Sequence, residues 1–411
     1  MSRPVPRRPS AGDPYGIRPS GSPTAAALSA VGLVVVALIT ASFMTGKIPS
    51  VPGTGDHGGG AVARTPVPSN VVVVNPAVSV RGSIVYAKAG NLWILSGTAT
   101  HQVTSSGHDA MPAWSPDGQW IYYIQTRTTN GFYPSTEGLS SYRLTYPVLM
   151  RVHPDGSGAQ QIISGLFTSN GGKYTWFSWY RQPSVSPDGK TLALVSDAPD
   201  PSNQDVVLQF LNLTTQKLTM PRIPENPPLG HQDPAWRPDG GAVAFVLNGH
   251  DGATGTPVIE LYNVKTGAVS ALTGPGFTNP SWSPDGRYLA ATKTTFYGTD
   301  VVILDAATGR VLVQVTTDGL SWAPTWSPAG NELVYLHLAG QTVDLKLVRL
   351  EGTAPAWTVK EQPNLTENSG LDGSSRASWY IPPDQLPTPA PTATPSPTPV
   401  ASGPAVSPSP S

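Results

Sequence analysis

The stretch Trp114–Gly118, WSPDG, decides the fold of this chain because closely related stretches follow it four times. Val185 opens VSPDG, Trp236 opens WRPDG, Trp282 opens WSPDG and Trp326 opens WSPAG. The intervals between these opening residues, which we call anchors, are 71, 51, 46 and 44 residues. Such intervals are close to the length of one four-stranded propeller blade. The repeats therefore predict a β-propeller.

Each repeat joins a turn to a strand. Ser-Pro-Asp-Gly suits a type I turn, in which proline presets φ at the second position and glycine takes the fourth. Segments with alternating apolar residues follow the turns, as expected for half-buried strands: residues 120–125, 191–196, 242–247, 288–293 and 332–337. The recurring aspartates of the turns are interpreted as turn caps, since they belong to separate blades: Asp117, Asp188, Asp239 and Asp285.

Strand counting predicts the number of blades and the closure of the ring. Five complete four-stranded units fit between residues 111 and 361. Three further strands precede them, and one follows at residues 376–383, with Trp379 in the anchor place. Three strands from one end and one from the other form a sixth blade, which leaves no long free sheet edge. The predicted fold class is all-β, a six-bladed β-propeller over residues 81–383 with three-plus-one strand closure.

The phrase PxWSPDG followed by a strand resembles the repeat of TolB-type propellers. The resemblance covers residues 81–383, about three quarters of the chain. It implies a six-bladed ring with the same three-plus-one closure. Similar propellers serve as binding platforms and as gating domains on peptidases, so the resemblance implies no particular chemistry. TolB itself is periplasmic and carries a small α/β domain before its propeller, where this chain has an apolar segment instead.

The N-terminal region predicts a membrane anchor. Residues 24–45 read TAAALSAVGLVVVALITASFMT and carry no charge, which is long enough for a helix that crosses a bilayer. Four arginines and one aspartate precede this run, so residues 1–23 are expected in the cytoplasm and the propeller outside. A cleaved signal peptide is the alternative. Residues 46–80 are expected to form a flexible linker, and the Pro/Ser/Thr-rich residues 384–411 a disordered tail.

Composition bears on the class of function. Only 12% of residues are charged and the net charge is −1, which indicates no general attraction to nucleic acid. The chain has no cysteine and no G-x-S-x-G stretch, and its histidines show no ligand spacing such as HxxxH. His108 and His231 stand just before inner strands of different blades, so the fold could bring them face to face across the channel mouth. We therefore predict no catalytic residue, no metal and no cofactor.

Aromatic residues concentrate between residues 126 and 182, which hold ten of the 33 in the chain. They belong to two insertions in the first complete unit, one joining its second strand to its third and one joining its fourth strand to the next inner strand. Because blade strands are antiparallel, both insertions leave on the same face of the ring. They are expected either to pack on each other as a local cap or to form a recognition surface for sugar rings or a peptide.

Residues three and four places before each anchor should ring the channel on that same face. A ligand at a propeller mouth would meet converging polar groups there, flanked by the aromatic insertions. The candidate binding residues are Tyr174, Trp176, Phe177, Trp179, Tyr180, Arg181, Asp233, Asn279, Trp322 and Arg376.

These observations predict a non-catalytic binding or scaffold module, anchored in the cell membrane, whose partner is an envelope protein or a cell-wall glycan. The alternative is a propeller enzyme acting on a sugar or lactone at the channel mouth. Such enzymes usually converge several carboxylates or a calcium ion on the channel, whereas only Asp233 and Asp109 approach it in this sequence.

The apolar run generates a first prediction. The intact protein should remain in the membrane fraction after carbonate washing, because a spanning helix holds it there. Protease added outside spheroplasts should digest the propeller. Recovery of soluble protein that begins between residues 46 and 64 would instead show a cleaved signal peptide.

Overall fold

The structure, a computed structural model, describes residues 71–136, 138–169, 173–201, 204–223, 230–249 and 257–387. The predicted cytoplasmic segment, the predicted membrane helix over residues 24–45, most of the predicted linker and most of the predicted tail lie outside these ranges. Among the residues that are described, no helix is long and apolar enough to span a membrane. The 3-10 turn Pro383–Gln385 is the helical element that they contain.

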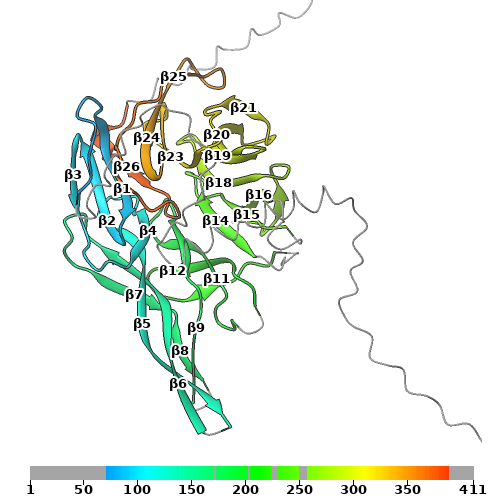
Figure 1. Cartoon of the computed structure of the whole chain (residues 1–411). Helices are drawn as coiled ribbons and strands as arrows, with labels where there is room; N and C mark the ends of the chain where they lie inside the picture. The colour runs from blue at the N-terminus through cyan, green and yellow to red at the C-terminus, as the bar shows by residue number, and fades with distance from the viewer. Residues whose placement is uncertain are drawn as a thin grey trace, which may run out of the picture. The chain divides into compact units, whose positions relative to one another are not determined.

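Six four-stranded antiparallel sheets form a ring around a central channel, which confirms the predicted all-β six-bladed propeller (Figure 1). Blade 1 consists of β4 (Asp109–Trp114), β5 (Ile121–Ser135), β6 (Gly138–Val152) and β7 (Gln160–Ser164). Blade 2 consists of β10 (Arg181–Val185), β11 (Thr191–Ser196), β12 (Val207–Asn212) and β13 (Leu218–Thr219). Blade 3 consists of β14 (His231–Trp236), β15 (Ala242–Leu247), β16 (Val258–Asn263) and β17 (Val269–Ala271).

The remaining blades follow the same order. Blade 4 consists of β18 (Phe277–Trp282), β19 (Tyr288–Thr295), β20 (Gly298–Asp305) and β21 (Val311–Gln314). Blade 5 consists of β22 (Ser321–Trp326), β23 (Glu332–Ala339), β24 (Thr342–Glu351) and β25 (Thr358–Glu361). The closing blade has the order β26 (Ser378–Tyr380), β1 (Val80–Lys88), β2 (Asn91–Gly97) and β3 (Ala99–Gln102), which confirms the three-plus-one closure. A small separate hairpin, β8 (Leu166–Ser169) and β9 (Tyr174–Phe177), joins blade 1 to blade 2.

The closure depends on the C-terminal anchor. Trp379 pairs with Ile84 in the β26–β1 ladder and donates its indole N–H to the Arg81 carbonyl at 2.8 Å. Its ring is 6% exposed and packs in a core cluster with Ile84 and with Leu345 of blade 5. The closing blade is therefore held both by strand pairing and by apolar burial against its neighbour.

The repeated turns have the geometry that their sequence predicts. In blade 1 the Ser115 hydroxyl donates to Asp117 at 2.5 Å and accepts the Trp120 N–H at 2.9 Å, while Asp117 also accepts the Gln119 N–H. Ser186 with Asp188, and Ser283 with Asp285, repeat the hydroxyl-to-carboxylate bond. The aspartates are turn caps, as predicted.

Residues 71–79, which the sequence places in the linker, contact the propeller. The Glu367 N–H donates to the Val73 carbonyl at 3.0 Å, and Val74 forms an isolated antiparallel bridge with Thr366. Val72 and Val78 are buried in the same cluster as Trp379. This segment, which we call the N-terminal strap, covers the seam between the closing blade and blade 5.

The closure generates a second prediction. A chain truncated after Glu367 loses β26 and Trp379, so it exposes the β1 edge and a large apolar surface. Loss of a buried tryptophan alone costs about 3–5 kcal/mol, and thermal unfolding should therefore occur at a much lower temperature. The matched control, truncation from Thr388, should unfold like the intact chain. Similar melting curves for the two truncations would contradict the role assigned to β26.

Candidate functional site at the channel mouth

Five inner strands carry a β-bulge at the same place. The residue three places before the anchor has a positive φ of 50–55° in each of them: Met111, Gln182, Asp233, Asn279 and Ala323. A proline follows each of these residues, and the strand register shifts across the pair. Positive φ is uncommon for residues other than glycine. Its recurrence at one position shows that the bulge is a feature of the blade, and it directs these residues toward the neighbouring blade.

The bulge residues are linked from blade to blade by hydrogen bonds. The Gln182 N–H donates to the Met111 sulfur at 3.3 Å, and the Asp233 N–H donates to Gln182 Oε1 at 3.0 Å. The Asn279 N–H in turn donates to Asp233 Oδ2 at 3.2 Å. The bulge N–H groups of Gln182, Asp233 and Asn279 are thus each received by the side chain of the preceding blade's bulge residue.

Two hydroxyls extend this series, which we call the channel girdle. Thr292 accepts the Ala323 N–H at 2.9 Å and donates to Asn279 Oδ1 at 3.0 Å. On the other side of the ring, Ser375 Oγ accepts the Met111 N–H at 2.5 Å. The girdle therefore consists of Met111, Gln182, Asp233, Asn279, Thr292, Ala323 and Ser375, and every blade contributes to it.

Asp233 is the carboxylate at the centre of the girdle. Gln182 Nε2 donates to Oδ1 at 2.6 Å, and Asn279 Nδ2 donates to Oδ2 at 2.8 Å. The side chain is buried, and burial raises the pKa of this carboxyl, while the positive charges of Arg376 and Arg181 and the hydrogen bonds from Asn279 oppose the rise. Its acceptor sites are engaged by neighbouring residues, so Asp233 organises the mouth.

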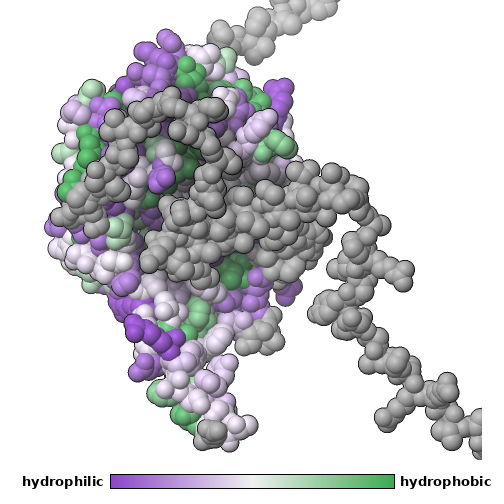
Figure 2. Space-filling model, viewed as in Figure 1, coloured by the Kyte–Doolittle hydropathy of each residue, from purple (hydrophilic) through white to green (hydrophobic). Residues whose placement is uncertain are grey.

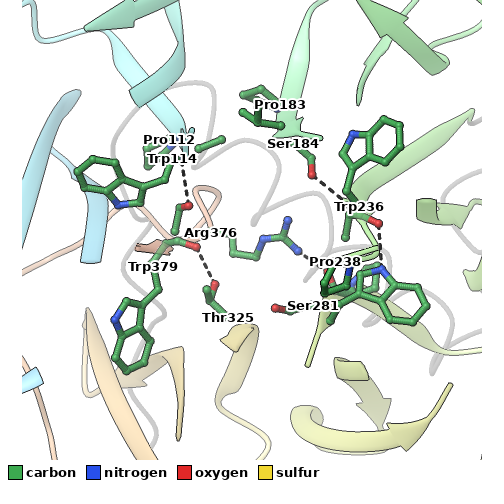
Figure 3. Close-up of a pocket in the computed structure, with 17 residues that line it drawn as sticks. Pro112, Trp114, Pro183, Ser184, Trp236, Pro238, Ser281, Thr325, Arg376 and Trp379 are labelled. Atoms are coloured by element: carbon green, nitrogen blue, oxygen red, sulfur yellow. Dashed lines mark hydrogen bonds between the residues drawn. The ribbon is translucent and has the colours of Figure 1, made fainter. Parts of the chain in front are cut away.

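Arg376 enters the channel from the closing blade. Its guanidinium points into the centre of the channel and donates to the Pro280 carbonyl at 2.6 Å (Figure 3). It lines a cavity of about 220 Å³ together with Ser184, Ser281 and Thr325. Since Arg376 also interacts electrostatically with Asp233, it connects the girdle to this cavity.

The two aromatic insertions of blade 1 pack on each other. β5 and β6 pair without interruption from Ile121–Val152 to Ser135–Gly138, so the first insertion lengthens the hairpin. The β8–β9 hairpin lies beside it, and the Tyr142 hydroxyl donates to the Thr175 carbonyl at 2.6 Å. We call residues 126–136, 138–147, 166–169 and 173–177 the arm. It extends away from the ring, and its surface is mostly pale with green patches toward the tip (Figures 1 and 2).

An exposed series of rings runs from the arm to the mouth. The centroids of Tyr174 and Trp176 are 6.0 Å apart, those of Trp176 and Phe177 are 6.0 Å apart, and those of Phe177 and Trp179 are 5.0 Å apart. The Arg181 guanidinium lies 6.0 Å from the Trp179 ring. Tyr174, Trp176 and Trp179 are 38%, 36% and 44% exposed. We call these five residues the aromatic ladder, and it ends at the residue whose charge acts on Asp233.

Two candidate residues lie elsewhere. Tyr180 is 5% exposed and packs in a core cluster with Tyr122 and Leu192, because backbone alternation turns it inward between the outward-facing Trp179 and Arg181. The sequence placed it on the binding surface, and the structure places it in the core. Trp322 donates its indole N–H to the Gly373 carbonyl at 2.8 Å and packs against the cluster around Trp379, away from the ladder.

The candidate set omitted five girdle residues: Met111, Gln182, Thr292, Ala323 and Ser375. Met111 and Ala323 lie three places before an anchor, where the sequence predicts the channel mouth. Gln182 and Ser375 occupy the positions that the anchor alignment identifies at the mouth, so the sequence contained their signal. Thr292 lies on a second strand, opposite Thr278 of the inner strand, and only the strand register brings it to the girdle.

The two histidines considered at the mouth do not form a pair site. His231 is 1% exposed, its Nδ1 accepts the Leu208 N–H at 2.9 Å, and its ring packs on Phe245. Burial lowers the pKa of His231 to about 4. His108 is exposed. Within the ranges that the structure describes, no group of three or more His, Cys, Asp or Glu residues could hold a metal ion.

Comparison with known proteins agrees with this architecture. The family profile described as TolB beta propeller domain matches residues 174–369. That match begins in the aromatic ladder and continues to the segment before the closing strand. Over these residues the ring is similar to a TolB-type β-propeller. No curated protein sequence matches the chain.

Solved structures show how far the TolB-type likeness extends. TolB from Acinetobacter baumannii aligns with a TM-score of 0.52 and 22% identity, over 72% of this chain and 66% of that chain. A putative TolB from Agrobacterium tumefaciens aligns at 0.48 and 18% identity, over 75% of this chain and 96% of that chain. A chain of a nidogen/laminin complex aligns at 0.50 and 12% identity, over 73% of this chain and 98% of that chain. At these identities the likeness concerns the fold alone, and this chain spans 66% of the length of the Acinetobacter protein.

The burial of His231 generates a third prediction. Because its folded pKa is lowered from 6.5 to about 4, the neutral form stabilises the fold fully above pH 6.5, and this contribution is lost as the pH falls toward 4. Linkage gives a loss of about 2 kcal/mol between pH 7 and pH 5. Urea unfolding at both pH values measures it. His231→Asn, which keeps an acceptor for the Leu208 N–H, should reduce this loss, and an equal loss in both proteins would contradict the assignment.

Proposed function

We propose that this TolB-type propeller is a membrane-anchored, extracytoplasmic binding module without catalysis of its own. Its ligand, an envelope protein segment or a cell-wall glycan, lies along the aromatic ladder and reaches the channel girdle. The observation that carries the proposal is the ladder itself: exposed rings spaced at 5.0–6.0 Å that end in an arginine at the mouth. Exposed aromatic surfaces of this kind mark sites of interaction.

The fold does not require the ladder. Other blades of the ring connect their fourth strand to the next inner strand without an additional aromatic hairpin; blade 4, for example, does so with residues 315–320. Exposed aromatic rings leave apolar surface in water, which folding alone would not favour. A ligand that covers these rings would remove their apolar surface from water, which explains why they are exposed in the free protein.

The girdle supports binding over acid–base chemistry. Asp233 receives hydrogen bonds on both carboxylate oxygens from Gln182 and Asn279, so these neighbours hold it within the girdle. Arg181 is exposed beside it and offers donors to a polar or anionic group of the ligand. Stacking on the rings and hydrogen bonding at the mouth would then act on one extended molecule.

Membrane anchoring is part of the proposal and is supported by the uncharged run at residues 24–45 and the arginines before it. It would place the propeller where envelope components are present. The strap at residues 71–79, which ties the chain to the ring, supports a direct connection between anchor and propeller.

The ladder generates a fourth prediction. Trp176→Ala with Trp179→Ala should weaken ligand binding by about 1–3 kcal/mol, the usual range for interface aromatics, and should leave the melting temperature nearly unchanged. Purified peptidoglycan sacculi probe glycan binding by co-sedimentation with the detergent-solubilised full chain. Crosslinking in membranes probes a protein partner.

The matched control is Tyr297→Ala, which removes an exposed ring from blade 4 and, in the detergent assay with sacculi, should bind like the intact protein. If the ladder is only a cap, the double variant should bind normally and unfold at a lower temperature. Equal recovery of sacculi or crosslinked partner by the double variant would refute the site.

A further inference from the structure

Blade 4 carries a second exposed aromatic feature, separate from the ladder. Phe296 and Tyr297 form the tip of the β19–β20 hairpin and are 93% and 86% exposed, the largest exposures among the large hydrophobic residues that the structure describes. Their rings meet edge to face with centroids 5.0 Å apart. We call this pair the aromatic tip.

The hairpin holds the tip in a defined geometry. Thr295 pairs with Gly298 at the end of the ladder, and its hydroxyl donates to the Gly298 carbonyl at 3.2 Å. Gly298 has a φ of 143°, and a Cβ there would approach the Gly319 carbonyl oxygen to 2.0 Å. The Thr299 N–H donates to that same carbonyl at 3.0 Å. Glycine at residue 298 therefore lets the hairpin pack on the loop before β22, and the two rings project from a supported turn.

The blade architecture does not need this pair. The equivalent turn of blade 5, between β23 and β24, is Gly340-Gln341, and that of the closing blade, between β1 and β2, is Ala89-Gly90. Small or polar residues thus complete the same turn elsewhere in the ring. Exposure of two large rings to water is unfavourable in free energy unless an apolar environment covers them.

The tip and the N-terminal strap are found at the same end of the blades. Turns between second and third strands, such as Phe296-Tyr297, leave on the face where fourth strands connect to inner strands. The strap meets the propeller in one of those connections, since Val74 bridges to Thr366, and Thr342 at the start of β24 contacts Asn368 in the same connection. Blade 5, where the strap arrives, follows blade 4 directly in the ring.

The length of chain before the strap limits the distance to the proposed anchor. Residues 46–70 separate the apolar run from the strap. A flexible linker of about 25 residues has a root-mean-square length of about 25–30 Å. With residues 24–45 in a bilayer, as proposed above, this length of chain keeps the propeller within reach of that bilayer.

We propose that Phe296 and Tyr297 insert into the interfacial layer of the membrane that anchors the chain. The inference rests on the proposed anchoring and adds an orientation: the channel mouth turns toward the bilayer. The structure favours a lipid surface over a protein for the tip because the pair projects from a hairpin turn, whereas protein hot spots lie in packed pockets at the centre of an interface. Aromatic rings with a polar edge, such as tyrosine, favour the membrane–water interface.

The experiment uses the absence of cysteine in the chain, which makes a single introduced thiol the only site of labelling. Full-length Phe296→Cys is labelled with an environment-sensitive fluorophore and reconstituted into vesicles of phosphatidylcholine and phosphatidylglycerol. We expect blue-shifted emission, and quenching when the lipids carry bromine on their acyl chains. Gln341→Cys, at the equivalent turn of blade 5, should be quenched much less, and Lys265→Cys, on the opposite face of the ring, should not be quenched.

The outcomes separate this inference from the anchoring on which it rests. Flotation of the vesicles first shows whether the chain is incorporated. Incorporated protein with an unquenched label at residue 296 would overturn the insertion while leaving the anchor intact. A label that stays open to aqueous iodide in vesicles but becomes protected when membrane proteins are added would also overturn it, in favour of a protein partner. A chain that fails to float would defeat the anchoring and the insertion together.

Discussion

Proline in the inner strands sets the constraint on which the ring depends. Pro112, Pro183, Pro234, Pro280 and Pro324 have no N–H, so each interrupts the ladder between the first and second strands of its blade. The residue before each proline adopts a positive φ, and its own N–H turns away from its sheet. That N–H is received by a side chain of the preceding blade. The interruption within each sheet thereby becomes the connection between sheets, and it concentrates polar groups at the channel.

The closing blade also connects to other blades, but without a proline or a bulge in its inner strand. Ala377 occupies the place of the proline, and Arg376 does not belong to the residues with a positive φ. Ser375 and Arg376 supply the contacts to blades 1 and 4 that bulge residues supply elsewhere. Because β26 comes from one end of the chain and β1 from the other, these contacts also join the two ends, and the strap adds a second tie at the same seam. The channel arginine and the closure of the ring are one structural arrangement.

The sequence was sufficient for the architecture because turns, anchors and strand periods are local signals that repeat. It identified six blades, the closure through Trp379 and the capping role of Asp117. It could not identify the girdle fully, since Thr292 joins it through strand register. Tyr180 was misplaced because a run of aromatics does not reveal which ring faces inward. His231 was considered at the mouth, but in the structure its Nδ1 accepts the Leu208 N–H. Thr104 accepts the Leu92 N–H in the same way in the closing blade.

Apolar packing explains the positions of the buried aromatic residues but not those of the exposed ones. Trp114, Trp326 and Trp379 recur at blade positions where apolar packing explains them. The ladder and the aromatic tip recur nowhere else among the described blades, and the same connections are completed without them. Folding energetics therefore explain the anchors and leave the exposed rings unexplained. Both exposed sets belong to connections that leave on one face of the ring, which is also where the strap arrives. A surface that faces the membrane and its associated envelope components accounts for both with a single orientation of the propeller.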